Sequence, residues 1–425
     1  MESIIISGGN RLSGTIKSSG SKNASLPILA LSILAKNFEV KNIPNLADVS
    51  SMLNLLKSLG VNYNFKDNNK RNAIKLESSD TISSLAKYDL VRKMRASFLV
   101  LGPLLTRNGY AKVSLPGGCA IGLRPVDLHV FAMKKLGADI ELQDGYVIAK
   151  ANKGRLIGNR ISFPQVSVGA TENAIIASVF ARGETLIQNA AMEPEVQDLC
   201  NCLVSMGVEI DGIGTSSIFI EGVTSLNKIS YSIISDRIEA CSFIIAAAIT
   251  QSQLTINNVN SEHIDSFLIV MKEMGLKFQV SKKAIEVYES GDLKPVDIKT
   301  SAYPGFPTDI QAQIVALACL SKGNSQIQEN IFENRFMHIP ELNRLGAKIT
   351  IQGNKAFIKG NSSFIGAEVM ATDLRASVSL ILAGLAAKGT TKVNRVYHLD
   401  RGYEKIDEKL FACGAEIYRK KNEVL

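Results

Sequence analysis

Hydrophobic and polar positions follow the same order six times along the chain. Each time an amphipathic run ends at a glycine, and a short stretch of alternating apolar and polar residues follows. The glycines are Gly60, Gly137, Gly207, Gly275, Gly346 and Gly414, which lie 77, 70, 68, 71 and 68 positions apart. A glycine between an amphipathic run and an alternating run, such as residues 347–351, is typical of a helix C-cap followed by a strand. The pattern therefore predicts six repeats of similar length.

A second kind of helix is predicted ahead of each amphipathic one. Residues 23–31, 237–249, 309–320 and 375–387 are apolar nearly all round after a polar start. A helix that is apolar on every side is buried, and the Ala, Ser and Gly content of these runs permits close helix packing. We therefore predict an α/β fold in which each repeat has one buried helix, one amphipathic helix and the strands between them.

The repeats predict two domains of three repeats each, because 425 residues exceed what one ordinary core supports. We expect the first domain at residues 22–233. The second domain is expected to be discontinuous, with residues 1–21 joined to residues 234–425. Residues 1–17 are predicted to be a strand segment that completes a sheet in the second domain.

The polar starts of the buried helices contain the first candidate site residues. They are Lys22 and Asn23, Arg95, Thr171 and Glu172, Asp236 and Arg237, Thr308 and Asp309, and Asp373 with Arg375. A helix N-terminus carries partial positive charge and free N–H groups, so several converging N-termini would bind an anion. Each polar start taken alone is ordinary helix capping. Six in matched positions predict a shared cleft between the domains.

The stretch at residues 115–127 reads LPGGCAIGLRPVD and brings a thiol close to a guanidinium. Its glycines allow the backbone to bend, and positive charge near Cys119 would acidify the thiol. Arg124 can bind a carboxylate or a phosphate with two parallel hydrogen bonds. The alternative is a surface turn that carries an incidental cysteine.

Composition narrows the function classes. The net charge is +8, but Lys and Arg are spread along the chain without a basic tract, so anionic small substrates explain the excess as well as nucleic acid does. With aromatics at 6% and no Trp, a repeat-built RNA-binding protein is disfavoured. The six cysteines form no C-x-x-C pair and there are only four histidines, so we expect no metal. The sequence contains no signal-peptide pattern and no apolar run of the roughly 18 residues that a membrane-spanning helix needs, which predicts a cytoplasmic protein that does not enter a membrane.

Several motifs together resemble one family. They are SGSKNASLPILA (19–30), KMRAS (93–97), PGGCAIGLRPVD (116–127), VSVGATEN (166–173), PGFPTDIQAQ (304–313), IFENRFMH (331–338), TDLRAS (372–377) and DRGYEKI (400–406). Jointly they resemble the UDP-N-acetylglucosamine 1-carboxyvinyltransferases, which are enolpyruvyl transferases of the EPSP synthase family. The resemblance covers essentially the whole chain. It implies an inside-out α/β barrel in each of two domains, with three βαβαββ-type repeats per domain, buried helices and outer sheets.

The resemblance also implies an activity. It is the transfer of the enolpyruvyl group of phosphoenolpyruvate to the 3-hydroxyl of UDP-N-acetylglucosamine, with release of phosphate through a tetrahedral addition–elimination intermediate. This is the first committed step of peptidoglycan precursor synthesis, which links the protein to cell wall biogenesis, cell shape, the cell cycle and cell division. No cofactor is implied, and the partners are the two small substrates, with no nucleic acid, membrane or obligate protein partner.

The site residues implied by the resemblance fall into four groups. Cys119 matches the loop proton donor, which forms a covalent pyruvate adduct and is alkylated by fosfomycin, and Asp309 matches the carboxylate beside the sugar hydroxyl. Phosphoenolpyruvate would contact Lys22, Asn23, Arg124 and Arg401, of which Lys22 and Arg401 also count as catalytic. The nucleotide sugar would contact Asn23, Arg95, Arg124, Pro125, Val126, Asp127, Leu128, Gln165, Val166, Ser167, Val168, Asp309 and Ile331. Arg335, Asp373 and Arg375 would support the site.

Two departures and two rivals remain. Leu123 is bulkier than the small residue expected before the loop arginine, and Met192 stands where a basic residue is often found. The nearest rival enzyme shares the fold and phosphoenolpyruvate but uses shikimate 3-phosphate as acceptor, and the cysteine loop argues against it. The other rival is a catalytically idle duplicate, which the intact catalytic residues argue against.

Overall fold

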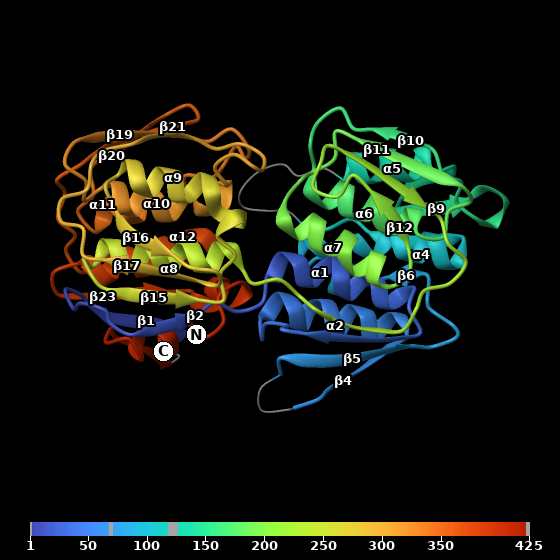
Figure 1. Ribbon diagram of the computed structural model, residues 1–425, viewed down its shortest axis with the longest axis horizontal. Helices are drawn as coiled ribbons and strands as arrows, with labels where there is room; N and C mark the ends of the chain where they lie inside the picture. Colours follow the sequence, from blue (N-terminus) through green and yellow to red (C-terminus); the bar gives the residue numbers. More distant parts are fainter. Residues whose placement is uncertain (1, 68–70, 118–125, 422–425) are drawn as a thin grey trace. The chain divides into compact units, whose positions relative to one another are not determined.

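The computed structural model describes residues 2–67, 71–117 and 126–421. The chain divides into two compact units. The continuous unit holds the described residues of 20–234, and the split unit holds those of 1–19 and 235–425. In each unit buried helices lie inside and sheets lie outside (Figure 1).

Both units contain helices and strands interspersed along the chain. In the continuous unit they are α1 (Lys22–Ala30), η1 (Leu31–Ile33), β3 (Asn37–Lys41), α2 (Ala47–Leu59), β4 (Val61–Phe65), β5 (Ala73–Ser78), β6 (Leu85–Ala86), α3 (Tyr88–Val91), η2 (Arg95–Val100), α4 (Leu101–Asn108), β7 (Tyr110–Ser114), α5 (Asp127–Lys135), β8 (Ala138–Gln143), β9 (Tyr146–Ala151), η3 (Asn152–Gly154), β10 (Arg160–Ser162), α6 (Val168–Ser178), β11 (Glu184–Gln188), α7 (Pro194–Ser205), β12 (Glu209–Asp211), β13 (Ser217–Glu221) and β14 (Ile229–Ser232). In the split unit they are β1 (Glu2–Ser7), β2 (Thr15–Lys17), α8 (Arg237–Ile249), β15 (Leu254–Asn257), η4 (Ser261–Ile264), α9 (Asp265–Glu273), β16 (Lys277–Val280), β17 (Ala284–Tyr288), β18 (Asp297–Lys299), η5 (Thr308–Ile310), α10 (Gln311–Ala318), β19 (Asn324–Gln328), α11 (Ile339–Arg344), β20 (Ile349–Gln352), β21 (Lys355–Lys359), β22 (Glu368–Met370), α12 (Leu374–Ala386), β23 (Thr390–Asn394), η6 (Val396–Arg401), α13 (Ile406–Phe411) and β24 (Glu416–Lys421).

The strands of the described residues form six four-stranded sheets with one topology. In the continuous unit the orders are β14-β3-β5-β4, β6-β7-β9-β8 and β10-β11-β13-β12, and in the split unit they are β2-β15-β17-β16, β18-β19-β21-β20 and β22-β23-β1-β24. In every sheet the first two strands pair in parallel and the other two pairs are antiparallel. The six predicted repeats and the α/β fold are therefore confirmed.

The N-terminal segment contributes to two sheets, whereas the sequence predicted that it completes one. β1 lies between β23 and β24, and β2 pairs in parallel with β15. Gly9 and Gly14, with φ of +91° and +100°, lie in the chain that separates the two strands. Because these left-handed positions redirect the backbone, one predicted strand segment becomes two strands in different sheets.

The buried helices lie where the apolar runs predicted them. All thirteen residues of α8 are buried, and α8, α10 and α12 pack against one another in the core of the split unit. In the continuous unit η2 packs against α1 and α6, and α4 packs against α6. Two of the predicted helical starts are 3₁₀ turns rather than α-helix, since Arg95 begins η2 and Asp309 lies in η5.

The six glycines end their helices as predicted. Gly60 has a φ of +107° and accommodates the left-handed turn between α2 and β4, and Gly275 has a φ of +89° between α9 and β16. A residue with a Cβ atom is strained in this region, which explains why glycine recurs at the position. Among the described residues, no helix combines the length and apolar character needed to cross a membrane.

Candidate active site

Three of the predicted site residues, Cys119, Arg124 and Pro125, lie outside the described residues, as does Leu123. The roles given to them remain predictions. The other predicted site residues are divided between the two units, with Lys22, Asn23, Arg95, Val126–Leu128 and Gln165–Val168 in the continuous unit and Asp309, Ile331, Arg335, Asp373, Arg375 and Arg401 in the split unit.

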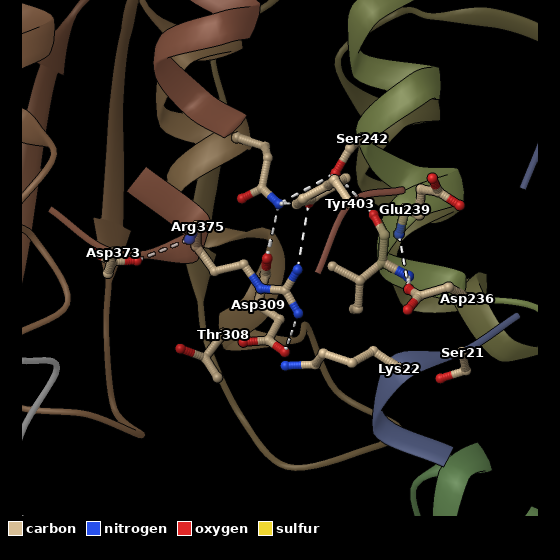
Figure 2. A network of polar contacts seen from close by, with 12 residues as sticks. Ser21, Lys22, Asp236, Glu239, Ser242, Thr308, Asp309, Asp373, Arg375 and Tyr403 are labelled. Carbon is tan, nitrogen blue, oxygen red and sulfur yellow. Dashed lines mark hydrogen bonds and ion pairs between the residues drawn. The ribbon is translucent and has the colours of Figure 1, made fainter. Parts of the chain in front are cut away.

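Asp309 is held by two buried arginines of the split unit. One of its carboxylate oxygens accepts a hydrogen bond from Arg335 Nη2 at 2.7 Å, and the other accepts one from Arg375 Nη2 at 2.8 Å. The arginine side chains are 4% and 7% exposed, whereas the Asp309 side chain is 27% exposed. Figure 2 shows the Arg375 side chain reaching from α12 to Asp309. The two arginines thus neutralise the charge of the Asp309 carboxylate, which remains partly exposed.

The pairing affects protonation as well as geometry. Burial lowers the pKa of Arg375, but the neighbouring negative charge of Asp309 outweighs it and raises that pKa above its usual value. Arg375 therefore stays charged inside the protein. The two arginines hold the carboxylate oxygens of Asp309 in a fixed position, and a positioned proton acceptor is one requirement of general base catalysis.

Glu329 connects Thr308, the residue before Asp309, to the backbone at Ile331. Its Oε2 accepts a hydrogen bond from the Thr308 hydroxyl at 3.0 Å, and its Oε1 accepts from the backbone N–H groups of Ile331 and Phe332 at 2.8 Å and 3.1 Å. Glu329 is 3% exposed. The sequence interpretation missed this residue because it lies two positions before the motif that begins at Ile331.

Asp373 acts as the N-cap of α12. Its Oδ1 accepts hydrogen bonds from the backbone N–H groups of Arg375 and Ala376, at 2.8 Å and 3.1 Å. This satisfies donors that a helix start leaves free, and it fixes the backbone from which Arg375 extends. The supporting role predicted for Asp373 is therefore consistent with its contacts.

The segment that carries Arg401 is fastened by Arg419 on β24. The Arg419 guanidinium binds both carboxylate oxygens of Asp400 at 3.0 Å and 2.6 Å, and it binds Asp407 at 3.1 Å. Hydrogen bonds to Asp400 raise the pKa of Arg419, with burial acting in the opposite direction. Since Asp400 immediately precedes Arg401, these bonds restrict the backbone on which Arg401 stands. Nothing in the local sequence around Arg419 indicated this pairing.

In the continuous unit the predicted cation Lys22 begins α1. The Ser21 side chain caps this helix by accepting from the Ala24 N–H at 3.3 Å. Lys22 Nζ lies 3.5 Å from a carboxylate oxygen of Asp48 on α2, and the two side chains are only 13% and 5% exposed. Asp48 is a second residue that the sequence interpretation missed, because an acidic residue in a helix's first turn is usual for capping.

The remaining residues of the continuous unit lie at helix starts. Arg95 begins η2, which packs against α1, and Asp127 and Leu128 begin α5, which packs against α6. Ser167 is the N-cap of α6 and accepts from the Ala170 N–H at 3.4 Å, while Gln165 and Val166 before it are exposed. Thr171 and Glu172 are buried one turn inside α6, so they are not at the helix start as predicted.

The chemistry of the described residues is that of cations and carboxylates. Among them there is no group of three or more His, Cys, Asp or Glu that could hold a metal. Burial lowers the pKa of His338 to about 4, so this side chain is neutral near pH 7. In the continuous unit, Lys22 and Arg95 lie at helix starts, where positive charge and free N–H groups suit anions. In the split unit, Asp309 is a partly exposed carboxylate, a group that can accept a proton.

Comparison with solved structures defines the class of fold. The enolpyruvyl transferase NikO from Streptomyces tendae superposes with a TM-score of 0.87 over 99% of both chains, at 24% sequence identity. The EPSP synthase from Acinetobacter baumannii superposes with a TM-score of 0.76 over 99% of this chain and 100% of its own, at 17% identity. At these identities the likeness concerns the fold, which is that of the enolpyruvyl transferases.

Sequence comparison is more specific. The EPSP synthase (3-phosphoshikimate 1-carboxyvinyltransferase) family matches residues 6–410, and this chain belongs to that family. The curated UDP-N-acetylglucosamine 1-carboxyvinyltransferase of Rickettsia akari (strain Hartford) is 51% identical over 419 residues, which cover 99% of this chain and 100% of that protein. The protein of the same name from Zymomonas mobilis is 52% identical over 423 residues, with 99% of each chain covered.

Proposed function

We propose that this protein is an enzyme that transfers the enolpyruvyl group of phosphoenolpyruvate to the 3-hydroxyl of UDP-N-acetylglucosamine and releases phosphate. The identity of about half of all residues to curated enzymes of that name, over the full chain, supports this substrate pair. The observation that carries the chemistry is the carboxylate of Asp309, which is held between Arg335 and Arg375 and remains partly exposed.

Asp309 is assigned to the sugar hydroxyl. In the addition step the carboxylate takes the hydroxyl proton while the oxygen bonds to C2 of phosphoenolpyruvate, and the methylene carbon takes a proton from Cys119. The product of this step is a tetrahedral intermediate. In the elimination step the new methyl group gives a proton back to the Cys119 thiolate and the C2–O bond to phosphate breaks, which forms the enol ether. The phosphate leaves with the proton that Asp309 had taken up, so both side chains return to their starting states.

The cations are assigned to phosphoenolpyruvate. Lys22, Arg124 and Arg401 would neutralise its phosphate and carboxylate, and Asn23 would add a hydrogen bond. The nucleotide sugar is assigned to Asn23, Arg95, residues 124–128, residues 165–168, Asp309 and Ile331. The expected domains are residues 22–233, and residues 1–21 with 234–425. A role in peptidoglycan precursor synthesis in the cytoplasm follows from the product.

Phosphate release tests the proposal. Purified protein with phosphoenolpyruvate should release phosphate only when UDP-N-acetylglucosamine is present, and mass spectrometry should detect the enolpyruvyl ether of the nucleotide sugar. Release that depends on shikimate 3-phosphate instead would assign the protein to the other enolpyruvyl transfer. No release with either acceptor would identify an idle duplicate.

A further inference from the structure

The phenol of Tyr403 is buried beside the Asp309–Arg375 pair. Tyr403 is 1% exposed, and its hydroxyl lies 2.8 Å from Ser242 Oγ, 3.2 Å from Gln313 Nε2 and 3.4 Å from Arg375 Nη1. Figure 2 shows Ser242 on α8 and Arg375 on α12 extending towards Tyr403. Gln313 on α10 contacts the same hydroxyl. In the sequence, Tyr403 follows Arg401 by two positions.

The direction of each hydrogen bond can be assigned from the partners. The Ser242 hydroxyl donates its one hydrogen to the backbone carbonyl of Ile238 at 2.8 Å, so towards Tyr403 it acts as the acceptor. The phenol therefore donates to Ser242. Its lone pairs then face Gln313 Nε2 and Arg375 Nη1, which have only hydrogens to offer.

Gln313 extends the same arrangement to the backbone of Asp309. Its Nε2 donates to the Asp309 carbonyl oxygen at 2.9 Å, and this carbonyl requires the amide nitrogen, rather than the amide oxygen, to face it. The phenol oxygen thus contacts both Gln313, which holds the Asp309 backbone, and Arg375, which holds the Asp309 carboxylate.

Arg375 is restrained at both ends of its guanidinium. Nη2 donates to Asp309 at 2.8 Å and Nη1 donates to the phenol at 3.4 Å, and the guanidinium carbon lies 5.8 Å from the centre of the Tyr403 ring. Gly402 packs so closely on Leu374 that an added Cβ would lie 2.6 Å from the Leu374 side chain. Residues 401–403 therefore pack against the first turn of α12, which carries Arg375.

We propose that Tyr403 is a positioning residue for the reaction, which aims Arg375 and, through Gln313, the backbone of Asp309, so that the Asp309 carboxylate meets the acceptor hydroxyl. The inference rests on the proposed role of Asp309 as the base. Tyr403 itself does not exchange a proton with substrate. Burial raises the pKa of the phenol although Arg375 opposes the shift, so the hydroxyl keeps its proton and its donor role at neutral pH.

The first test replaces the phenol oxygen alone. Tyr403→Phe keeps the ring but leaves Arg375 Nη1 and Gln313 Nε2 without this acceptor, and we expect kcat to fall roughly tenfold or more while both KM values stay within about twofold. The matched control is Tyr288→Phe, which removes a hydroxyl that donates to Glu286 at 2.7 Å on the surface of the same unit. The control should keep the wild-type kcat. An unchanged kcat in Tyr403→Phe would overturn the inference.

A double-mutant cycle separates this inference from the proposed function. If Tyr403 acts through Asp309, Tyr403→Phe should cost little further kcat in an Asp309→Asn background. Independent, multiplying losses would overturn the inference and leave the role of Asp309 intact. Near-normal turnover by Asp309→Asn alone would instead overturn the role of Asp309 in the proposed function.

Ser242→Ala provides a second route if Tyr403→Phe does not fold. It removes one oxygen atom, which accepts the phenol proton and also a hydrogen bond from Gln313 Nε2 at 3.3 Å. The phenol O–H bond is then free to turn, so its lone pairs are no longer directed at Arg375. We expect a smaller fall in kcat than for Tyr403→Phe and the same non-additivity with Asp309→Asn. A wild-type kcat in Ser242→Ala would count against the positioning role.

Discussion

At the scale of single residues, Asp309 is the side chain on which the proposed chemistry depends. Two arginines 26 and 66 positions away in the sequence bind its two oxygens. Removing one partner of a buried charged pair leaves the others uncompensated, so the arginines and the carboxylate act as one group. Substitution of Asp309 by its amide changes the charge with little change in shape.

We expect Asp309→Asn to lower kcat by roughly 10²-fold or more, because an amide cannot accept the hydroxyl proton. Binding of UDP-N-acetylglucosamine, measured by calorimetry, should survive. Asp292→Asn is the control, since Asp292 is 77% exposed in the same unit and forms only a surface ion pair at 3.6 Å from Lys322. Near-normal turnover of Asp309→Asn would remove the residue from the mechanism.

The cysteines are the second feature at this scale. The five described cysteines, Cys200, Cys202, Cys241, Cys319 and Cys413, are buried. Burial raises the pKa of Cys200 and of Cys319 to about 12, so neither forms an appreciable amount of thiolate near pH 7. Their thiols are expected to be inert towards electrophiles.

We expect fosfomycin to form a single adduct, at Cys119, and to form it faster with UDP-N-acetylglucosamine present. Peptide mapping by mass spectrometry locates the adduct. Cys119→Asp should resist fosfomycin and keep activity, because a carboxylic acid can also donate the proton, whereas Cys119→Ser should be far less active. An adduct at one of the five buried cysteines, or none at all, would refute the assignment of Cys119.

At the scale of elements, α6 carries a buried carboxyl group in its interior. Glu172 is 4% exposed. Burial raises its pKa well above the usual carboxyl value, and the charges of Glu195 and Glu193 near α7 raise it further. In the unfolded chain this carboxyl loses its proton near its ordinary pKa, so folding at neutral pH must take up a proton or bury a charge. The free energy of unfolding that depends on Glu172 therefore falls as pH rises above that ordinary value.

Glu172→Gln should accordingly raise the unfolding temperature at pH 7, and the gain should shrink as pH is lowered towards about 4, where the wild-type carboxyl is protonated in both states. Differential scanning calorimetry at several pH values measures this. Glu184→Gln, at an exposed position on β11 of the same unit, is the control and should show no such trend. A gain independent of pH would mean that proton uptake by Glu172 is not its cause.

At the scale of the whole molecule, the described residues form six sheets with the same topology, but strands that follow one another in the sequence do not always belong to the same sheet. β2 precedes α1 in the sequence but pairs with β15 in the split unit, and β14 precedes α8 but pairs with β3 in the continuous unit. β1, from the start of the chain, lies between β23 and β24 from its end and completes their sheet. Each unit thus needs strands from distant parts of the chain to complete its sheets.

The proposed substrate contacts also draw on both units, Lys22 on the continuous unit and Asp309 and Arg401 on the split unit. We therefore expect UDP-N-acetylglucosamine to make the protein more compact, because one substrate pair can engage both sets of residues only if the units close on it. Small-angle scattering should show a smaller radius of gyration with the nucleotide sugar at saturation. Shikimate 3-phosphate is the control ligand, and an unchanged profile with UDP-N-acetylglucosamine would contradict closure.

Local pattern alone was enough to predict the repeats, the buried helices and the glycines that end the amphipathic helices. Residues 237–249 were predicted as a helix and form α8 with the same bounds, because an N-capping aspartate precedes a run that is apolar or small at every position except Arg237 and Glu239. The positive φ at Gly60 follows from its place between a helix and a strand. The family motifs likewise identified Asp309, Arg335 and Arg375 before their contacts were known.

Only the tertiary structure decided which distant groups meet. The strand segment at residues 1–17 carried no signal that it would divide between two sheets, since pairing partners are set by packing and not by periodicity. The same holds for Ser242 and Tyr403, which are 161 positions apart, and for Asp48 beside Lys22. The preference of a segment for helix or strand depends on its neighbouring residues, so the sequence determined the helices and strands. A hydrogen bond between two helices forms only when the fold has brought them together, so the fold determined the hydrogen-bond network around Asp309.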